Sequence, residues 1–284
     1  MASLKIGFVS DSVCDLPPTL IEKWNIGLVP IFVNFGNQSL ADDSHELDRA
    51  EFARTVLEIN PPPTTAAPPP IYAERAIGKA LETADHVIAI VAPARYSGVF
   101  NAFRLGAQAF PAERVTLIDG GQISMGTGFQ VLYGAEAAAA TGSLKDTLDV
   151  IERVRRNTVV YAAGATLDQV RRSGRVGWAT ANIGALLQIK PVIKVYDGLI
   201  EAADRVRTFK RALDRVAELA AQHAPFDRAA LLHLHAEATL DELGDRMKDT
   251  LPEDTLRLPA GVALSVHLGP GAVGVAGVSQ AWKN

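Results

Sequence analysis

The sequence predicts an α/β protein with two domains: an N-terminal mostly parallel sheet with helices on both faces, and a C-terminal mixed α/β sandwich. In the first half, short apolar runs alternate with helical patterns, which is the rhythm of βαβ units. In the second half, Asp197-Gly198 is a strong hairpin-turn signal between two apolar runs. A length of 284 residues fits two domains or one large one. We therefore expect domains at residues 1–155 and 156–284.

The first half is expected to contain four strands separated by helices. The strands are predicted at Ile6–Val9, Gly27–Phe35, His86–Ala92 and Val115–Ile118. Helices are predicted from Pro17-Pro18 to about Trp24, after a capping box at Asp48 and Glu51, from Ser97, after the loop Asp119–Gly128, and from Ser143 to about Arg156. Residues Pro61–Pro70 include six prolines, so they form an ordered but non-helical loop.

The second half mixes hairpins with helices. Strands are predicted at Val159–Ala163, Val192–Tyr196, Leu199–Val206, Ala229–His235, Val262–His267 and Ala272–Val278. Helices are predicted at Thr208–Ala221 and Leu240–Lys248, and a short helix and a strand between Arg175 and Lys194. The last two strands would turn at Gly269-Pro270-Gly271.

Composition and charge exclude some classes of function. A net charge of −4 argues against a nucleic-acid-binding protein. Residues 150–215 nevertheless carry 13 Lys/Arg and 6 Asp/Glu, which indicates either a solvated helical face or a surface for an anionic ligand or acidic partner.

The cysteine count and the hydropathy pattern indicate the cellular compartment in which we expect the protein. Cys14 is the only cysteine, so no internal disulfide forms, as in a reducing compartment. The N-terminus lacks a signal-peptide pattern, and no apolar run of about 18 residues is free of charges and helix breakers. We expect a cytoplasmic protein without an integral membrane span.

Ligands of open α/β sheets bind at the carboxyl ends of the strands. The polar loops predicted there are Ser10–Asp15, Thr64-Thr65, Ala94–Gly98 and Asp119–Gly128. Ser97 is either an ordinary N-cap or a hydroxyl aimed at an anion, and both can hold. Thr65 is either a turn hydroxyl or a ligand donor that the stiff proline loop positions.

The histidines and the absence of two sequence motifs limit the kinds of catalytic or metal site that we expect. His267 is either a satisfied core histidine or a site residue, and His233 with His235 lacks a third metal ligand. No GxxxxGK[ST] phosphate loop and no GxSxG elbow is present. We therefore predict no catalytic residue, no metal and no cofactor.

Eight short motifs together resemble the DegV family of fatty-acid-binding proteins from Ile6 to about Val278. In chain order they are Ser10-Asp11-Ser12 with Asp15-Leu16, Thr65-Ala66-Ala67-Pro68, Tyr96-Ser97-Gly98, Asp119 with Ser124-Met125-Gly126 and Gly128, Ser173-Gly174-Arg175, Ile189-Lys190-Pro191 with Asp197-Gly198, Arg205-Val206-Arg207, and His267-Leu268-Gly269-Pro270-Gly271. Each motif is short, but their common order makes a chance match improbable.

The resemblance implies a lipid carrier without enzymatic activity of its own. A long-chain fatty acid such as palmitate would lie between the two domains. A separate ATP-binding fatty-acid kinase would phosphorylate its carboxylate to an acyl phosphate, a step in phospholipid metabolism. Thr65 and Ser97 match the family residues that hold the carboxylate, and Arg175 and His267 match residues near it. Gly98 and Gly126 belong to the matching glycine motifs and complete the expected ligand-binding set.

The chain departs from the family pattern at four positions. Ala66, Val99 and Gly120 stand where the pattern has hydroxyl residues, and Ser173 stands where it has a glycine. Without these hydroxyls, we expect the contacts to the head group of the fatty acid to be altered.

Three alternatives stay open at this point. The chain could be a stand-alone serine hydrolase that uses Ser97 and His267, a lipid sensor or storage protein without a kinase, or a carrier of another apolar acid. Turnover of an ester by the chain alone would favour the first.

Overall fold

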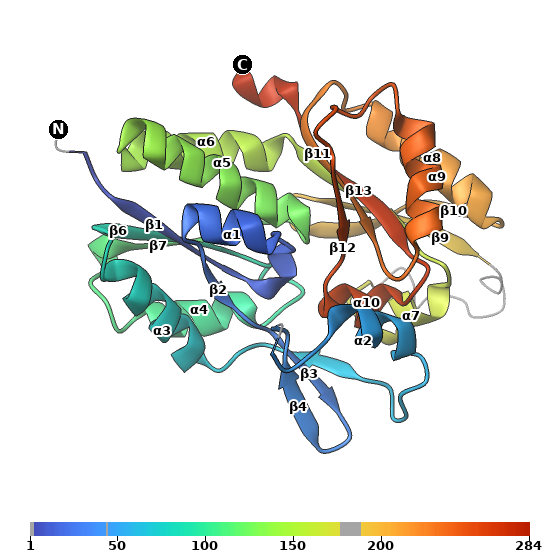
Figure 1. Ribbon diagram of the computed structural model, residues 1–284, viewed down its shortest axis with the longest axis horizontal. Helices are drawn as coiled ribbons and strands as arrows, with labels where there is room; N and C mark the ends of the chain where they lie inside the picture. The colour runs from blue at the N-terminus through green and yellow to red at the C-terminus, as the bar shows by residue number, and fades with distance from the viewer. Residues whose placement is uncertain (1–2, 44, 177–188) are drawn as a thin grey trace. The chain divides into compact units, whose positions relative to one another are not determined.

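The computed structural model describes residues 3–43, 45–176 and 189–284 (Figure 1). The chain divides into two compact units. Unit 1 comprises Met1–Phe32 and Ala66–Arg156, and unit 2 comprises Val33–Thr65 and Asn157–Asn284. Each unit is described below by itself.

Unit 1 is built on a four-stranded parallel sheet in the order β2-β1-β6-β7. The strands are β1 (Ile6–Asp11), β2 (Gly27–Val29), β6 (His86–Val91) and β7 (Val115–Asp119). All three pairings are parallel, which confirms the predicted parallel sheet. Every residue of β6 is buried, as expected for a central parallel strand. The predicted strand Gly27–Phe35 is interrupted at Pro30, because proline has no N–H for a sheet ladder.

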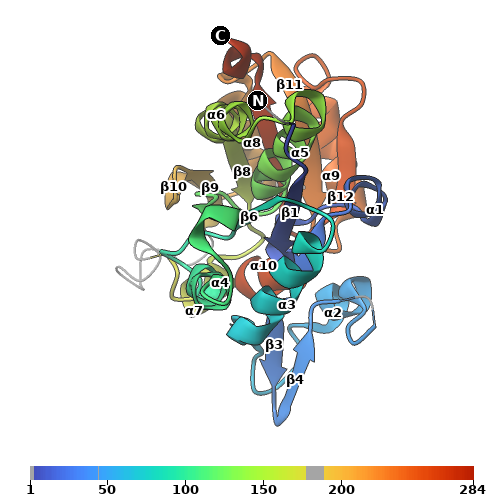
Figure 2. The ribbon, with the colours of Figure 1, turned by 90° about the vertical axis from the view of Figure 1, so that its left-hand side faces the viewer.

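Helices cover both faces of this sheet, as predicted (Figures 1 and 2). Helices α3 (Pro70–Leu81) and α4 (Val99–Ala107) pack on one face, and α5 (Met125–Thr141) packs on the other, with α6 (Leu144–Arg156) against it. The remaining elements are α1 (Pro18–Trp24) and the short 3-10 helices η1 (Ser12–Cys14) and η2 (Ala112–Arg114). Helix α3 was not predicted, although Pro70 in its first turn is a standard start signal.

Unit 2 contains a six-stranded mixed sheet in the order β10-β9-β8-β13-β11-β12. The strands are β8 (Thr158–Ala163), β9 (Lys190–Tyr196), β10 (Leu199–Val206), β11 (Phe226–His233), β12 (Leu256–Pro259) and β13 (Val273–Ser279). Only β11 and β12 pair in parallel. Tyr196 pairs with Leu199, so the hairpin predicted at Asp197-Gly198 is confirmed, with positive φ at both turn residues.

Helices α8 (Phe209–Ala221) and α9 (Glu237–Met247) pack on this mixed sheet and bury its main core. Leu213, Leu231 and Leu243 are among its fully buried side chains. Two shorter helices, α2 (Arg49–Thr55) and α7 (Leu167–Arg172), each contact α10 (Val262–Leu268), and the 3-10 helix η5 (Gln280–Lys283) lies near the C-terminus.

Residues 33–65 differ from the predicted domain division, because they cluster with unit 2 and not with the N-terminal residues. They contribute most of a small sheet in the order β4-β3-β5, formed by β3 (Phe32–Phe35), β4 (Gln38–Ala41) and β5 (Thr64–Ala66). They also carry α2, which packs against α10. Residues 33–65 belong to unit 2 because they contact segments far away in the sequence. A single boundary between two continuous domains therefore cannot describe this division.

The strand predicted at Val262–His267 is wrong, because these residues form helix α10. A short apolar run fits a buried helix as well as a strand. Here Ser265 N donates to Gly261 O, and Gly269 N donates to Ser265 O, so the backbone bonds close within the segment. Val262, Ser265 and Val266 are buried at helical spacing.

Candidate functional site

The carboxyl edge of the parallel sheet in unit 1 is held together by two aspartates. Asp11 ends β1 and accepts hydrogen bonds from Ala92 N at 2.7 Å and Val13 N at 2.9 Å. Asp119 ends β7 and accepts from Ala94 N at 3.1 Å and Gly121 N at 3.0 Å. These carboxylates bond to backbone N–H groups, so they fix the loops after β1, β6 and β7.

Ser97 and Gly98 lie in one of these loops, directly before α4. Ser97 is half-buried, and its Oγ accepts a hydrogen bond from Val99 N at 3.3 Å. Helix α4 therefore starts two residues later than predicted, with Ser97 supporting its first turn. A Cβ atom on Gly98 would lie 3.2 Å from Ala67 Cβ, so glycine lets residues 67 and 98 approach closely. The two loops that carry the predicted hydroxyl motifs thus meet here through Ala67 and Gly98.

Gly126 lies in the first turn of α5 and is buried. Its carbonyl accepts from Gln130 Nε2 at 3.1 Å, and the same amide nitrogen donates to Gly120 O at 2.8 Å. Gln130 therefore ties the loop after β7 to the start of α5. A Cβ atom on Gly120 would lie 3.0 Å from Val91 O, which gives a steric reason for glycine where the family pattern has serine.

Unit 2 brings together two predicted site residues that lie far apart in the sequence. Thr65 Oγ1 of β5 is 3.0 Å from Nε2 of His267 in α10, and 202 positions separate the two residues. The packing of α2 against α10 accompanies this bond. Thr65 is partly buried, so its hydroxyl lies near the surface of the unit.

His267 is neutral near pH 7. Burial, with a contribution from the positive charge of Arg175, lowers the pKa of His267 from 6.5 to about 4. Its Nδ1 atom is buried and, within the described part of the chain, has no hydrogen-bond partner. A hydroxyl can donate or accept, so Thr65 does not fix which imidazole nitrogen carries the proton. The imidazole can therefore adapt to a donor or an acceptor on a ligand.

Arg175 is exposed and is held at its base by Ser173. Arg175 Nη1 donates to Ser173 O at 2.7 Å, and Arg175 N donates to Ser173 Oγ at 3.3 Å. Ser173 Oγ in turn donates to Val170 O at 2.7 Å, at the end of α7. Sequence reasoning noted Ser173 only as a departure from glycine, and it missed this supporting role.

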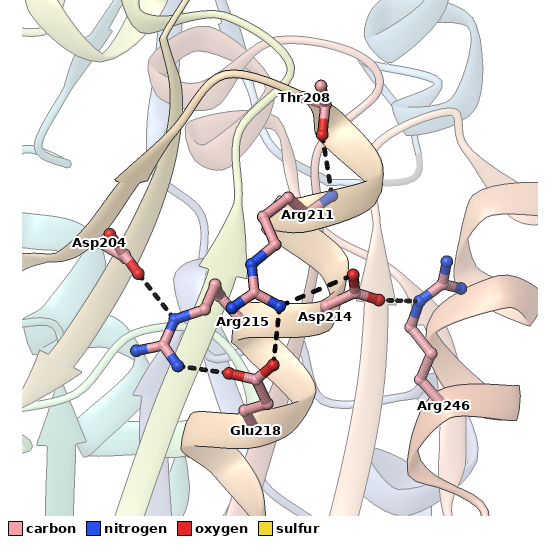
Figure 3. A network of polar contacts seen from close by, with 7 residues as sticks. All are labelled: Asp204, Thr208, Arg211, Asp214, Arg215, Glu218 and Arg246. Atoms are coloured by element: carbon pink, nitrogen blue, oxygen red, sulfur yellow. Dashed lines mark hydrogen bonds and ion pairs between the residues drawn. The ribbon is translucent and has the colours of Figure 1, made fainter.

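Part of the basic segment 150–215 is paired with nearby acidic side chains (Figure 3). On α8, Arg215 Nε lies 2.7 Å from Asp204, and Arg211 lies 2.9 Å from Glu218. Arg246 of α9 joins the network through Asp214 at 3.0 Å. These contacts favour the solvated helical face over a broad docking surface for an anionic partner.

Arg155 and Arg156 on α6 are likewise paired, both with Glu152. For Arg171, Arg172 and Arg175, by contrast, the described part of the chain offers no ion pair. Three arginines without an ion pair among the described residues therefore lie in the last turn of α7 and just after it.

The described residues contain no group of three or more His, Cys, Asp or Glu side chains that could hold a metal ion. His233 ends β11, and its Nδ1 accepts from Ala236 N at 3.3 Å. His235 follows with a positive φ of 48°. Within the same described ranges, no helix is long and apolar enough to cross a membrane.

The predicted residues thus fall into two groups. Ser97 and Gly98 lie on a loop at the sheet edge of unit 1 and Gly126 lies in the first turn of α5, whereas Thr65, Arg175 and His267 gather in unit 2. The first group supplies one hydroxyl, and the second supplies a hydroxyl, a neutral imidazole and a cation. Hydroxyls and a nearby cation are suited to binding a carboxylate.

Comparisons with known proteins match one family over most of the chain. The model of the DegV family, described as "Uncharacterised protein, DegV family", matches residues 5–280. A DegV domain-containing protein of Streptomyces coelicolor is 32% identical over 278 residues, with 96% of this chain and 98% of the relative covered. A DegV domain-containing protein of Deinococcus radiodurans is 34% identical over 277 residues, with coverage of 96% and 98%.

Two solved structures are similar over almost their whole length. A DegV family protein of Thermus thermophilus, described by its fatty acid binding, is 32% identical with a TM-score of 0.86, covering 97% of this chain and 99% of that one. DegV of Bacillus subtilis, described as a fatty acid binding protein, is 26% identical with a TM-score of 0.86, covering 98% and 100%.

Proposed function

Because the chain belongs to the DegV family, we propose that it binds a long-chain fatty acid and presents the carboxylate to a separate ATP-binding kinase. One observation carries the lipid-binding part: Thr65 and His267, named by the family resemblance, form a 3.0 Å hydrogen bond. The fatty acid binding described for the Thermus thermophilus relative supports the ligand class.

The acyl chain and the carboxylate head group of a fatty acid contribute separately to its binding free energy. Burial of an acyl chain contributes roughly 0.8 kcal/mol per methylene, so about 16 carbons give more than about 10 kcal/mol before entropic costs. An unpaired buried carboxylate would offset much of this gain. Thr65 and Ser97 would donate hydrogen bonds to the carboxylate, and Arg175 would supply positive charge. The placement of the acyl chain between the two domains stays a prediction.

In the proposed transfer, a carboxylate oxygen attacks the γ-phosphorus of ATP, and the bond to the β-phosphate oxygen breaks, which releases ADP and an acyl phosphate. This chain has no phosphate-loop motif, so ATP would bind on the kinase. Arg175, exposed and anchored through Ser173, would stabilise the phosphoryl charge or dock the kinase. A cytoplasmic location belongs to this proposal, because the reaction consumes ATP.

The hydrolase alternative has weaker support. Ser97 Oγ accepts from Val99 N, and His267 Nε2 is bonded to Thr65, so each candidate catalytic atom has another partner. A histidine with a pKa of about 4 is also a poor general base near pH 7.

Native mass spectrometry of the gently purified protein, followed by ligand extraction, tests the lipid-binding part. We expect one long-chain fatty acid per chain. A protein that carries no lipid and binds no added palmitate would contradict the proposal.

Transfer of ³²P from ATP in the presence of a bacterial fatty-acid kinase tests the second part. We expect Arg175→Ala to lower acyl-phosphate formation at least about tenfold while palmitate binding persists, since the charge acts on the phosphoryl group. Arg172→Ala, a neighbouring exposed arginine, is the matched control and should retain transfer. Equal loss in both variants, or in neither, would refute the role of Arg175.

A further inference from the structure

The loop between β6 and α4 (Figure 1) carries an arginine directly before the motif Tyr96-Ser97-Gly98. Arg95 lies two residues before Ser97, whose hydroxyl is expected to hold the carboxylate, and the Arg95 side chain is exposed. Consecutive Cα atoms are about 3.8 Å apart, so at most about 7.6 Å separates the Cα atoms of these two residues. A long arginine side chain covers a distance of this order, so its guanidinium can reach the proposed head group.

Backbone hydrogen bonds hold this loop in a tight turn. Tyr96 N and Ser97 N both donate to Pro93 O at 3.1 Å. Ala94 N donates to the Asp119 carboxylate, also at 3.1 Å. The residues on either side of the arginine are therefore anchored, while its side chain extends into solvent. A fixed backbone lowers the entropy that is lost when such a side chain is positioned on a ligand.

The charge of Arg95 is not used within the described part of the chain. No ion pair to Arg95 occurs among residues 3–43, 45–176 and 189–284. Asp119 anchors the same loop, but its carboxylate accepts from backbone N–H groups. Arg104 of α4 differs, because its Nε and Nη2 atoms donate to Asn101 Oδ1 at 3.2 and 2.8 Å. The Arg95 guanidinium is therefore available to an anion from another molecule.

The first turn of α4 adds positive electrostatic potential at the same loop. This helix of nine residues begins at Val99, and its N-cap residue Gly98 makes no side-chain cap. Ser97 Oγ accepts only from Val99 N and keeps its own hydrogen for a ligand. The N-terminal end of a helix carries a partial positive charge that favours anions. The hydroxyl, the helix end and the guanidinium therefore all favour negative charge on one loop.

On the premise of the proposed function, we propose that Arg95 is a catalytic residue that binds the γ-phosphoryl oxygens during transfer from ATP to the carboxylate. A carboxylate oxygen forms the new bond to phosphorus, the bond to the β-phosphate oxygen breaks, and ADP leaves. Arg95 donates hydrogen bonds and exchanges no proton, because a guanidinium stays protonated in proteins. Its planar fork of N–H groups matches phosphate oxygens, and arginines supplied by a partner protein stabilise phosphoryl transfer in other enzymes.

Steady-state kinetics of acyl-phosphate formation, with palmitate-loaded protein as the substrate of a bacterial fatty-acid kinase, test this role. We expect Arg95→Ala to lower kcat at least about a hundredfold, since arginines supplied by a partner contribute about 10³–10⁵ to the rate. The KM for the loaded protein and the Kd for palmitate should stay within about twofold of the wild type. Arg95→Lys should recover only part of kcat, because lysine keeps the charge but lacks the fork. Arg104→Ala is the matched control and should retain full kcat.

Binding to the kinase separates a catalytic role from a structural one. ADP with aluminium fluoride imitates the phosphoryl group in transfer, so the wild type should bind the kinase at least about tenfold tighter with this mimic than with ADP alone. Arg95→Ala should lose that gain and keep the wild-type affinity in ADP alone.

Three results would overturn the role of Arg95: full kcat in Arg95→Ala, a higher KM with kcat retained, or a matching loss of palmitate affinity. If circular dichroism shows that Arg95→Ala does not fold, Arg95→Gln replaces it. A wild-type protein that binds palmitate but forms no acyl phosphate would contradict the proposed kinase step, and the role of Arg95 with it. Normal transfer by the Arg95 variants would remove only this residue and leave the proposed function standing.

Discussion

Two histidines, one in each unit, show how differently the two regions are built. His86 of unit 1 is bonded through both nitrogens, with Nδ1 donating to Glu113 O at 2.9 Å and Nε2 accepting from Thr116 Oγ1 at 2.8 Å. His267 of unit 2 has one bond, to Thr65, and feels the charge of Arg175. Burial lowers the pKa of both side chains. His86 is therefore a structural group with a fixed tautomer, and His267 keeps a nitrogen for a ligand.

The same contrast holds for charge at the predicted site. In unit 1, Asp11 and Asp119 bond to backbone N–H groups and fix loops. Unit 2 places a cation, Arg175, close enough to affect His267. The carboxylate charges at the sheet edge of unit 1 therefore hold loops in place, whereas unit 2 keeps a cation whose charge acts on a predicted site residue. Four predictions test this difference, in order of decreasing effect.

The largest effect is expected from truncation of the unit 1 core. Phe129 of α5 is fully buried, so Phe129→Ala should lower the free energy of unfolding by about 3–5 kcal/mol, measured by urea denaturation. Leu105→Ala on α4, where the side chain is 39% exposed, is the control and should cost under about 0.5 kcal/mol. Similar losses in the two variants would contradict the burial of Phe129 in the core of unit 1.

The second effect concerns pH. The unfolded chain binds a proton at His267 near pH 6.5, and the folded chain only near pH 4, so stability falls as pH drops through this window. The expected loss is at most about 3.5 kcal/mol, from a shift of about 2.5 pKa units at about 1.4 kcal/mol per unit. His267→Gln should flatten the pH dependence of unfolding.

An NMR titration of His267 that gave a pKa above 6 would contradict this account. His86→Gln serves as the comparison, because it breaks two hydrogen bonds and should destabilise the protein at every pH.

The third effect is on ligand affinity. Thr65→Val keeps the shape of the side chain but removes the hydroxyl that contacts His267, so palmitate affinity should fall about tenfold, or about 1–2 kcal/mol. Thr64→Val, at the exposed neighbour on β5, should bind palmitate like the wild type. Calorimetry on delipidated protein measures both, and equal affinities for the two variants would remove Thr65 from the site.

The smallest effect is expected from the charge network of unit 2 (Figure 3). Asp204→Asn removes the charge from the 2.7 Å contact with Arg215, and ion pairs near the surface, like this half-buried one, contribute at most about 1 kcal/mol. The free energy of unfolding, obtained from thermal denaturation, should differ from that of Asp254→Asn, an exposed control, by no more than about 1 kcal/mol. A change in kinase turnover, with stability retained, would reopen the docking role of α8.

Much of the architecture was predictable because it depends on local patterns. The fully apolar run at β6 predicted a central parallel strand, and Asp197-Gly198 predicted a hairpin. Asp48 caps α2 as expected, accepting from Ala50 N and Glu51 N. The basic segment was harder to interpret, because its charge balance depends on partners such as Arg246 that lie outside it.

The sequence by itself determined the α/β class, the parallel sheet of unit 1 and the membership in a family, since periodicity, turn residues and short motifs are local properties. Only the tertiary structure decided that Val262–Leu268 is a helix and that residues 33–65 join unit 2. It also decided that Thr65 contacts His267, since packing joined residues 202 positions apart. Burial at that contact lowers the pKa of His267, which no local pattern encodes.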